Sequence, residues 1–280
     1  MKTIRSWRRH HYVSIVGILL IALMLIAGMV GCEPSGAVTF GDPNLEAEVR
    51  EAIAIPEGPI YPSDLDGLTS LNATAEYIGD LTGLEYCISL TGLDLSYNHI
   101  SDISPLANLT NLTELELWGN QISDISPLAN LTSLTDLELV KNHISDISPL
   151  ANLTSLTQLN LWDNQISDIS ALANLTSLTV LGLWWNQISD ISPLANLTSL
   201  TDLQLWGNQI SDISPLANLT SLTVLLLYNN QISDISPLVD NEGLSEGDKV
   251  YLTGNPLSTD SVNTYIPQLE ARGVIIEYYN

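Results

Sequence analysis

The chain has 280 residues and a formal net charge of −24 at pH 7, from 32 acidic and only 8 basic residues. All the acidic residues follow Cys32, whereas four of the basic residues precede it, so residues 33–280 carry 4 − 32 = −28. Such a segment is repelled by the phosphates of nucleic acid and of bare anionic lipid, and it holds no basic patch. We therefore exclude nucleic acid as a partner.

Residues 1–32 have the features of an export signal: a basic start, an uncharged apolar run over residues 13–31, and a small residue before Cys32. The end of this run, Met29-Val30-Gly31-Cys32, resembles the lipobox of bacterial lipoproteins. That resemblance implies that Cys32 becomes the lipid-modified first residue and that this N-terminal lipid is the only membrane anchor. An uncleaved membrane helix stays open as an alternative, because the apolar run is long enough to span a bilayer.

A short Pro/Gly/Ser-containing linker over residues 33–39 leads to a predicted helical N-terminal cap over residues 40–67. Asp42 is a suitable helix cap, and Pro43 suits the first helical position. The apolar face predicted for this helix consists of Leu45, Val49, Ala52 and Ile53. Three prolines between residues 56 and 66 predict a loop.

The region over residues 68–239 repeats one pattern every 22 residues: L-x-x-L-x-L-x-x-N-x-I-x-x-I-x-x-L-x-x-L. In one copy, Leu115 and Leu117 alternate with outward Glu114, Glu116 and Trp118, which predicts a short strand. Ser-Pro at residues 126–127 predicts a capped 3₁₀ or helical turn on the opposite side. One copy cannot bury its leucines alone, so the copies are expected to stack with parallel strands.

This pattern resembles the leucine-rich repeat in its 22-residue bacterial form, as in the internalin family. The resemblance implies an α/β solenoid: a right-handed superhelix with a parallel concave sheet, 3₁₀ turns or short helices on the convex side, a helical N-cap and an α/β C-cap. It also implies a non-enzymatic module that binds a protein through its concave face.

Two polar columns accompany the repeat. The first is a predicted ladder of asparagines whose amides satisfy turn backbone groups: Asn98, Asn120, Asn142, Asn164, Asn186, Asn208 and Asn230. The second is a column of turn aspartates: Asp102, Asp124, Asp146, Asp168, Asp190, Asp212 and Asp234. A row of Ca²⁺ sites is one interpretation of the second column. We favour local capping of backbone N–H groups, because one carboxylate per turn is far from the six to eight oxygens that Ca²⁺ requires, and we predict no metal site.

Cys87 occupies the position that Leu109 fills one repeat later, which predicts a buried thiol without a disulfide to Cys32. Residues 240–280 are predicted to form the C-terminal cap. Within it we expect a strand at residues 250–252 and Asn255 in the asparagine position. We also expect a helix over residues 258–272, interrupted near Pro267. A last strand is expected over residues 274–279.

Catalytic and cofactor motifs are missing from the sequence. There is no H-E-x-x-H, G-x-S-x-G, phosphate-binding glycine loop or paired-cysteine metal motif. The acidic residues recur as repeat columns rather than as one unique pair. We therefore predict that the chain is not an enzyme and needs no cofactor.

The predicted binding surface combines aromatic and acidic residues on the concave face. The aromatic residues fall at the strand-end position or beside it: Trp118, Trp162, Trp184, Trp185, Trp206 and Tyr228. The acidic residues are expected to rim them: Asp94, Glu114, Glu116, Asp136, Glu138 and Asp202. Exposed aromatic rows mark binding surfaces, although duplicated tryptophans that merely stack on one another are an alternative. We expect an outward-facing, lipid-anchored monomer of the bacterial cell envelope that binds a protein. Polysaccharide binding and a purely structural spacer stay open as alternatives.

Overall fold

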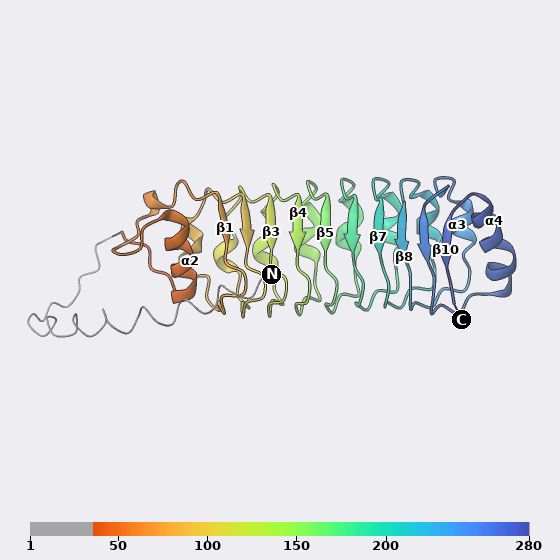
Figure 1. Cartoon of the computed structure of the whole chain (residues 1–280), viewed down its shortest axis with the longest axis horizontal. Coiled ribbons are helices and arrows are strands. Elements are labelled where there is room, and N and C mark those ends of the chain that lie inside the picture. The colour runs from red at the N-terminus through yellow and green to blue at the C-terminus, as the bar shows by residue number, and fades with distance from the viewer. Residues whose placement is uncertain (1–35, 280) are drawn as a thin grey trace, which may run out of the picture. The chain divides into compact units, whose positions relative to one another are not determined.

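The computed structural model describes residues 36–279, and the part from Val38 onward forms one compact unit. In this unit ten strands form a single sheet in which every strand pairs in parallel with its neighbours in the sequence (Figure 1). The predicted α/β solenoid with a parallel sheet is therefore confirmed. The predicted export signal and Cys32 lie outside the described residues.

Each strand has three residues, and its middle residue points into the core. In β3, Leu115 is buried while Glu114 and Glu116 are exposed, as the alternation predicts. Leu115 aligns with the central leucine of β4, so the apolar residues form a continuous row across the sheet. The strands are β1 (Ser70–Asn72), β2 (Gly92–Asp94), β3 (Glu114–Glu116), β4 (Asp136–Glu138), β5 (Gln158–Asn160), β6 (Val180–Gly182), β7 (Asp202–Gln204), β8 (Val224–Leu226), β9 (Lys249–Tyr251) and β10 (Ile275–Glu277).

Short helical turns lie opposite the strands, one in nearly every repeat. They are the 3₁₀ turns η1 (Pro62–Asp64), η2 (Leu84–Tyr86), η3 (Ser104–Leu106), η4 (Ser126–Leu128), η5 (Ser148–Asn152), η6 (Ser170–Asn174), η7 (Ser192–Asn196) and η8 (Ser214–Asn218), and the α-helix α3 (Ser236–Asp240). The predicted loop before the repeats thus contains η1. The serine before the proline was predicted to be the cap, which is wrong. Ser126 is the first residue of η4, and its N–H is bound by the Asp124 carboxylate at 2.8 Å.

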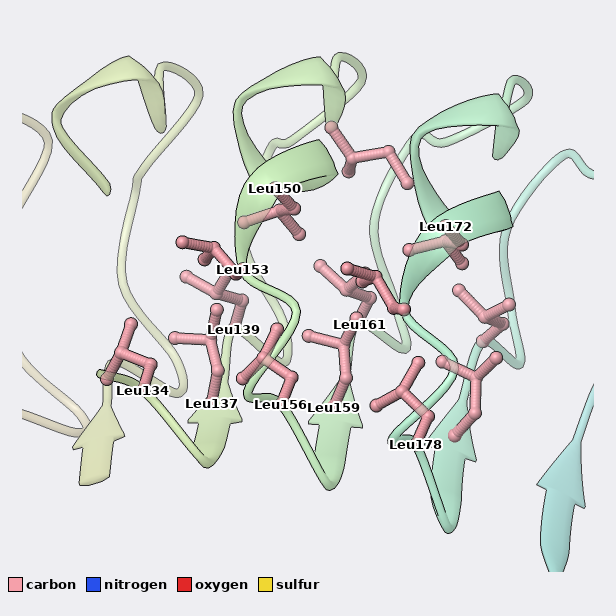
Figure 2. Packing of buried hydrophobic residues seen from close by; sticks show 14 of the residues in the cluster. Leu134, Leu137, Leu139, Leu150, Leu153, Leu156, Leu159, Leu161, Leu172 and Leu178 are labelled. Atoms are coloured by element: carbon pink, nitrogen blue, oxygen red, sulfur yellow. The ribbon is translucent and has the colours of Figure 1, made fainter. Parts of the chain in front are cut away.

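The core lies between the strands and these turns. Leucines from consecutive repeats point into the same space, where each contacts its equivalents in the neighbouring repeats (Figure 2). Leu137, Leu159 and Leu161 are completely buried. Full burial of a leucine side chain contributes about 1.5–3 kcal/mol to the free energy of unfolding. Because the repeats stack, the leucines of every repeat make this contribution.

The predicted asparagine ladder is present at the end of the strands. Asn164 Nδ2 donates to the carbonyl oxygens of Leu139 and Leu161, both at 3.0 Å, and Asn164 Oδ1 accepts the Ile144 N–H at 3.0 Å. Each amide thus joins its own turn to the preceding repeat. Asn255 continues the ladder into the C-terminal cap, with bonds to Leu227 and Leu252.

A threonine ladder, which the sequence analysis missed, closes the other end of the strands. Thr135 Oγ1 donates to the carbonyl oxygen of Thr113, and Thr157 Oγ1 to that of Thr135, both at 3.1 Å. The signal was available, because threonine recurs every 22 residues just before the strand. Asparagine and threonine therefore hold the strand layer from both ends.

The residue before each ladder asparagine adopts a left-handed backbone conformation, which the sequence analysis also missed. This conformation turns the chain out of the strand, and only glycine adopts it without a steric cost. The column contains Tyr97, Gly119, Lys141, Asp163, Trp185, Gly207 and Asn229.

The N-terminal end of the stack carries α2 (Pro43–Ile53). Asp42 accepts the Asn44 N–H at 2.9 Å, as its predicted capping role requires. Leu45 and Val49 are buried, but Ala52 is exposed, so its predicted place on the apolar face is wrong. Ile53, the last residue of the helix, is partly buried and packs against the core as predicted.

Cys87 is completely buried and free, and burial raises the pKa of its thiol to about 12. The predicted absence of a disulfide stays a prediction, because Cys32 lies outside the described residues.

The C-terminal end is covered by a helical segment and β10. The π-helix η9 (Ser261–Tyr265) leads into α4 (Ile266–Ala271), so the predicted interruption lies just before Pro267, which cannot donate a backbone hydrogen bond. No helix within residues 36–279 is both long and apolar enough to cross a membrane. The domain boundaries given above stay predictions.

Candidate interaction surface

The outer side of the sheet, predicted to be concave and called the sheet face from here on, carries the outward residues of β1–β10 and the strand-end column. Along this face the outward side chains change from mainly acidic to partly apolar. The outward residues of β2–β4 are largely acidic, whereas Val180 on β6 and Val224 and Leu226 on β8 are apolar. The predicted site residues therefore separate into two neighbouring regions.

The first region, the aromatic row, consists of Trp118, Trp162, Trp184, Trp206 and Tyr228, with Trp185 beside it. Trp162 and Trp184 stack with ring centroids 3.9 Å apart and planes inclined by 10°, and Trp184 and Trp206 stack at 4.5 Å and 14°. Parallel strands lie about 4.8 Å apart, which is close to the spacing of offset-stacked aromatic rings. Tryptophan at the same position of consecutive repeats therefore stacks without distortion.

Val140 interrupts the row, and the neighbouring rings close over it. Trp118 and Trp162 are two strands apart, yet their ring centroids lie only 5.6 Å from each other. Val140, at the equivalent position of the strand between them, is 1% exposed although it does not belong to the leucine core. We infer that the two rings lean toward each other and bury the valine.

The row is half-buried rather than freely exposed, so the expectation of projecting tryptophan anchors needs correction. Trp118, Trp162, Trp184 and Trp206 are all partly exposed, and only Trp185, at 48%, counts among the exposed large apolar residues. The rings do stack on one another, as the alternative interpretation stated. Stacking covers both faces of the Trp184 ring, so the exposed part of this ring lies at its edges.

Trp185 is exposed because it lies in the turn after the strand, where its backbone is left-handed, rather than in the strand-end column. Its φ is +52°, and its ring makes edge contacts with Trp184 and Trp206 at 5.2 and 4.9 Å. The ring also lies against Gly207, where a Cβ atom would collide with it. Tyr97 and Gly119 repeat the same arrangement near the other end of the row. A glycine one repeat later thus makes room for each of these two turn aromatics.

The second region, the acidic cluster, consists of Asp94, Glu114, Glu116, Asp136 and Glu138. Glu114 aligns with Asp136, and Glu116 aligns with both Asp94 and Glu138, so the carboxylates come from three consecutive strands. Within the described residues the only ion pair joins Arg50 to Glu46 in α2. Among residues 36–279, no cation is therefore paired with the cluster.

The cluster is partly withdrawn from water, and this changes its acidity. Desolvation, followed by the charges of Asp136 and Glu116, raises the pKa of Glu138 to about 7, although a hydrogen bond from Asn160 opposes the shift. The pKa values of Glu116 and Asp136 are also raised, again mainly by desolvation and then by neighbouring carboxylates. The folded chain thus holds three carboxylates whose charged form is less favoured than in the free side chain.

The predicted acidic rim is not what the structure shows. The five carboxylates of the acidic cluster lie together over β2–β4, to one end of the aromatic row rather than around it. Asp202, on β7, lies apart from them and accepts a hydrogen bond from Gln204 at 3.1 Å.

The turn aspartates belong to neither region. Asp168 Oδ1 accepts the Ser170 N–H at 2.8 Å, and this bond holds the pKa of Asp168 below its usual value. Every aspartate of the column makes the equivalent bond. No group of three or more possible metal-ligating His, Cys, Asp or Glu side chains is found in residues 36–279.

Comparison with known proteins agrees with this architecture. The family model described as leucine-rich repeats in two copies matches residues 88–130, 132–174 and 176–218. The crystal structure of internalin C2 from Listeria monocytogenes is 43% identical with a TM-score of 0.70, over 73% of this chain and 91% of that chain. The chain belongs to the leucine-rich repeat family, in its internalin-like form, and this class of protein is a non-enzymatic interaction module.

Two further solved structures show the range of this fold. A leucine-rich repeat protein of Leptospira interrogans is 22% identical, with a TM-score of 0.60 over 78% of this chain and 63% of that chain. The plant peptide hormone receptor RGFR1, in complex with RGF2, is 26% identical, with a TM-score of 0.61 over 78% of this chain and 38% of that chain. The search of curated proteins found no match.

Proposed function

We propose that this chain is a recognition module that binds a protein partner through the sheet face as a monomer. The observation that carries the proposal is the aromatic row, because tryptophan and tyrosine are enriched among the few residues that supply most of the binding energy at protein interfaces. A solenoid also presents such a surface as a continuous strip over many repeats. The comparisons support this class of function, since leucine-rich repeat proteins bind other polypeptides, as the receptor complex illustrates.

The geometry of the row favours a protein over a polysaccharide. Sugar rings stack their C–H groups on the π-electron faces of aromatic side chains, but both faces of Trp184 are covered by Trp162 and Trp206. The exposed edges carry the positive part of the ring quadrupole and suit carbonyl oxygens and aliphatic side chains instead. Those groups are abundant on polypeptides.

A paired set of variants tests this function. Trp184→Ala and Trp185→Ala together remove the centre of the row, whereas Asn152→Ala changes an exposed residue of η5 on the opposite side. Immobilised wild-type chain should retain partner proteins that the tryptophan variant loses and the η5 variant keeps. Equal retention by all three chains, or retention of glycans alone on an array, contradicts the proposal.

We also propose that the module is displayed at the bacterial cell envelope, anchored by a lipid on Cys32. The supporting observation is the sequence around Gly31-Cys32, which resembles a lipobox. In a bacterial host the wild-type chain should incorporate labelled fatty acid and lose Met1, whereas Cys32→Ser should not become labelled. An unlabelled wild-type chain that keeps Met1 contradicts this anchoring and favours an uncleaved membrane helix.

A further inference from the structure

Building on the proposed function, we infer that the sheet face binds an extended polypeptide segment with lysine or arginine at one end and apolar side chains at the other. The acidic cluster receives the basic end, and the aromatic row receives the other end together with the apolar outward residues of β6 and β8, which flank Asp202 and Gln204 of β7. The kind of partner follows from charge complementarity along a surface that no part of the described chain covers.

In the part of the chain that the structure describes, no lysine or arginine is paired with the acidic cluster, although its setting favours a cation. Lys141 is the only basic residue between residues 51 and 248, and its Nζ lies 5.4 Å from the Trp162 ring centroid rather than in an ion pair with the cluster. Partly desolvated like charges on neighbouring strands repel one another, and a bound cation relieves that repulsion.

A hollow beside the cluster offers space for a side chain. It has a volume of about 160 Å³, lies over β1–β3, and includes Gly92, Asp94, Glu114 and Glu116 in its lining. It is open because Gly92 has no side chain at a position where the next three strands carry Glu, Asp and Gln. A Cβ at Gly92 would meet Ser70 Oγ at 3.7 Å and Glu114 Oε2 at 3.9 Å, so the space accepts ordinary van der Waals contacts.

The junction between the two regions leaves hydrogen-bonding capacity unused. Ser96 is 3% exposed and follows Asp94 at the end of β2, and its Oγ has no hydrogen-bond partner among the described residues. Trp118 Nε1, at the same position one repeat later, is also buried without one. Buried polar atoms are normally paired, but neither atom is accessible to solvent, so a carbonyl oxygen of a bound polypeptide reaches them only if the side chains that cover them move.

The apolar end of the segment fits the other half of the sheet face. Three outward side chains of this half are apolar and partly exposed: Val180, Val224 and Leu226. The exposed Trp185 lies in the turn that follows β6. From β2 to β8 there are six strand steps, roughly 29 Å at 4.8 Å each, which an extended segment of about nine residues spans at ~3.3 Å per residue.

The test measures binding of a synthetic nine-residue peptide to the full chain in detergent by calorimetry. The peptide carries two lysines in its first half and leucines in its second half, separated by serines, and its reversed sequence is measured as well. The control peptide has acetyl-lysine in place of lysine. The wild-type chain should bind one of the two lysine sequences at least tenfold more tightly than its acetylated form, and the difference should shrink at high salt.

Matched variants locate the interaction. Glu114→Gln with Glu116→Gln should weaken lysine-peptide binding at least tenfold. Asp168→Asn with Asp190→Asn, which removes the same charge from the turns, should leave it unchanged. Gly92→Leu fills the hollow without altering charge, and its backbone is not in the left-handed region, so the variant should fold and bind more weakly.

Four results overturn the inference: no binding of either lysine sequence, equal binding of the acetylated peptide, equal losses in the two charge variants, or binding of an oligosaccharide in its place. Failure here is distinguishable from failure of the proposed function. If protein partners are lost by the tryptophan variant but kept by Glu114→Gln with Glu116→Gln, the sheet face binds protein by another chemistry. If neither variant loses them, the proposed function fails as well.

Discussion

The edge turns and the sheet face both present polar side chains in register along the repeats, but they differ in how those side chains are satisfied. At the turns, Asn164 makes hydrogen bonds to two repeats, and Asp168 is bound by the N–H two residues later. On the sheet face, Glu116 and Glu138 lie beside other carboxylates and form no ion pair with any described residue, and their pKa values are raised. Side chains that are hydrogen-bonded within the chain stabilise the stack of repeats. Side chains without such partners are available to bind another molecule.

The largest expected effect is loss of a ladder asparagine. Asn164→Ala leaves the Ile144 N–H and the carbonyl oxygens of Leu139 and Leu161 without their side-chain partner. Each unpaired buried polar group lowers the free energy of unfolding by about 1–3 kcal/mol. We expect Asn164→Ala to lower it by about 3 kcal/mol, the upper value. Chemical denaturation of wild type and variant measures it. A loss below about 0.5 kcal/mol contradicts the ladder's structural role.

The next effect distinguishes a stacked aromatic row from free anchors. Trp184→Ala removes two stacked pairs, each contributing about 0.5–1.5 kcal/mol, so the free energy of unfolding should fall by about 2 kcal/mol. A freely exposed ring would give almost no loss, and a fully buried one about 3–5 kcal/mol. Tryptophan emission should be only partly quenched by acrylamide, and complete quenching of the row contradicts the stacked arrangement.

A smaller effect, with the opposite sign, is expected in the acidic cluster. The pKa of Glu138 is about 7 in the folded chain, above the value of 4.5 for the free side chain, so between these pH values the folded state binds more protons than the unfolded state. Stability therefore falls as pH rises through this window. Glu138→Gln should stabilise the fold by about 1 kcal/mol at pH 8, after allowance for partial exposure, and hardly at all at pH 4.5.

Thermal unfolding at the two pH values measures this difference, with Asp136→Asn as a second member of the cluster. Equal stability changes at pH 8 and pH 4.5 show that Glu138 is not desolvated in the way described here.

The smallest effect is expected at the turns. Asp168→Asn keeps an oxygen that accepts the Ser170 N–H, so the melting temperature at pH 7 should change by less than about 2 °C. The sign of the pH dependence is opposite to that of Glu138. The pKa of Asp168 is lowered, so its contribution is present above pH 3.8 and is lost as pH falls through its folded-state pKa. A marked fall of the melting temperature at pH 7 would contradict the interpretation that Asp168 only caps the Ser170 N–H.

The repeat architecture was predictable from the sequence because its determinants are local and recur with one period. The alternation around Leu115 fixes the strand, and the recurrence of Asn120 every 22 residues fixes where the chain turns. The capping of α2 by Asp42 and the burial of Cys87 followed from the same local reasoning. The threonine ladder was also visible as a residue type that recurs every 22 residues, whereas the left-handed turn column carries six different residue types and gave no such signal.

The tertiary structure alone decided how the side chains of neighbouring repeats meet. The sequence placed tryptophans in one column, but only the structure shows that the rings of Trp162, Trp184 and Trp206 stack on one another. Likewise, the sequence supplied the carboxylates, but their gathering over β2–β4, the hollow at Gly92 and the raised pKa of Glu138 depend on desolvation and on distances between different repeats. The reason is physical: local geometry is set by neighbours along the chain, whereas burial and charge repulsion are set by neighbours in space.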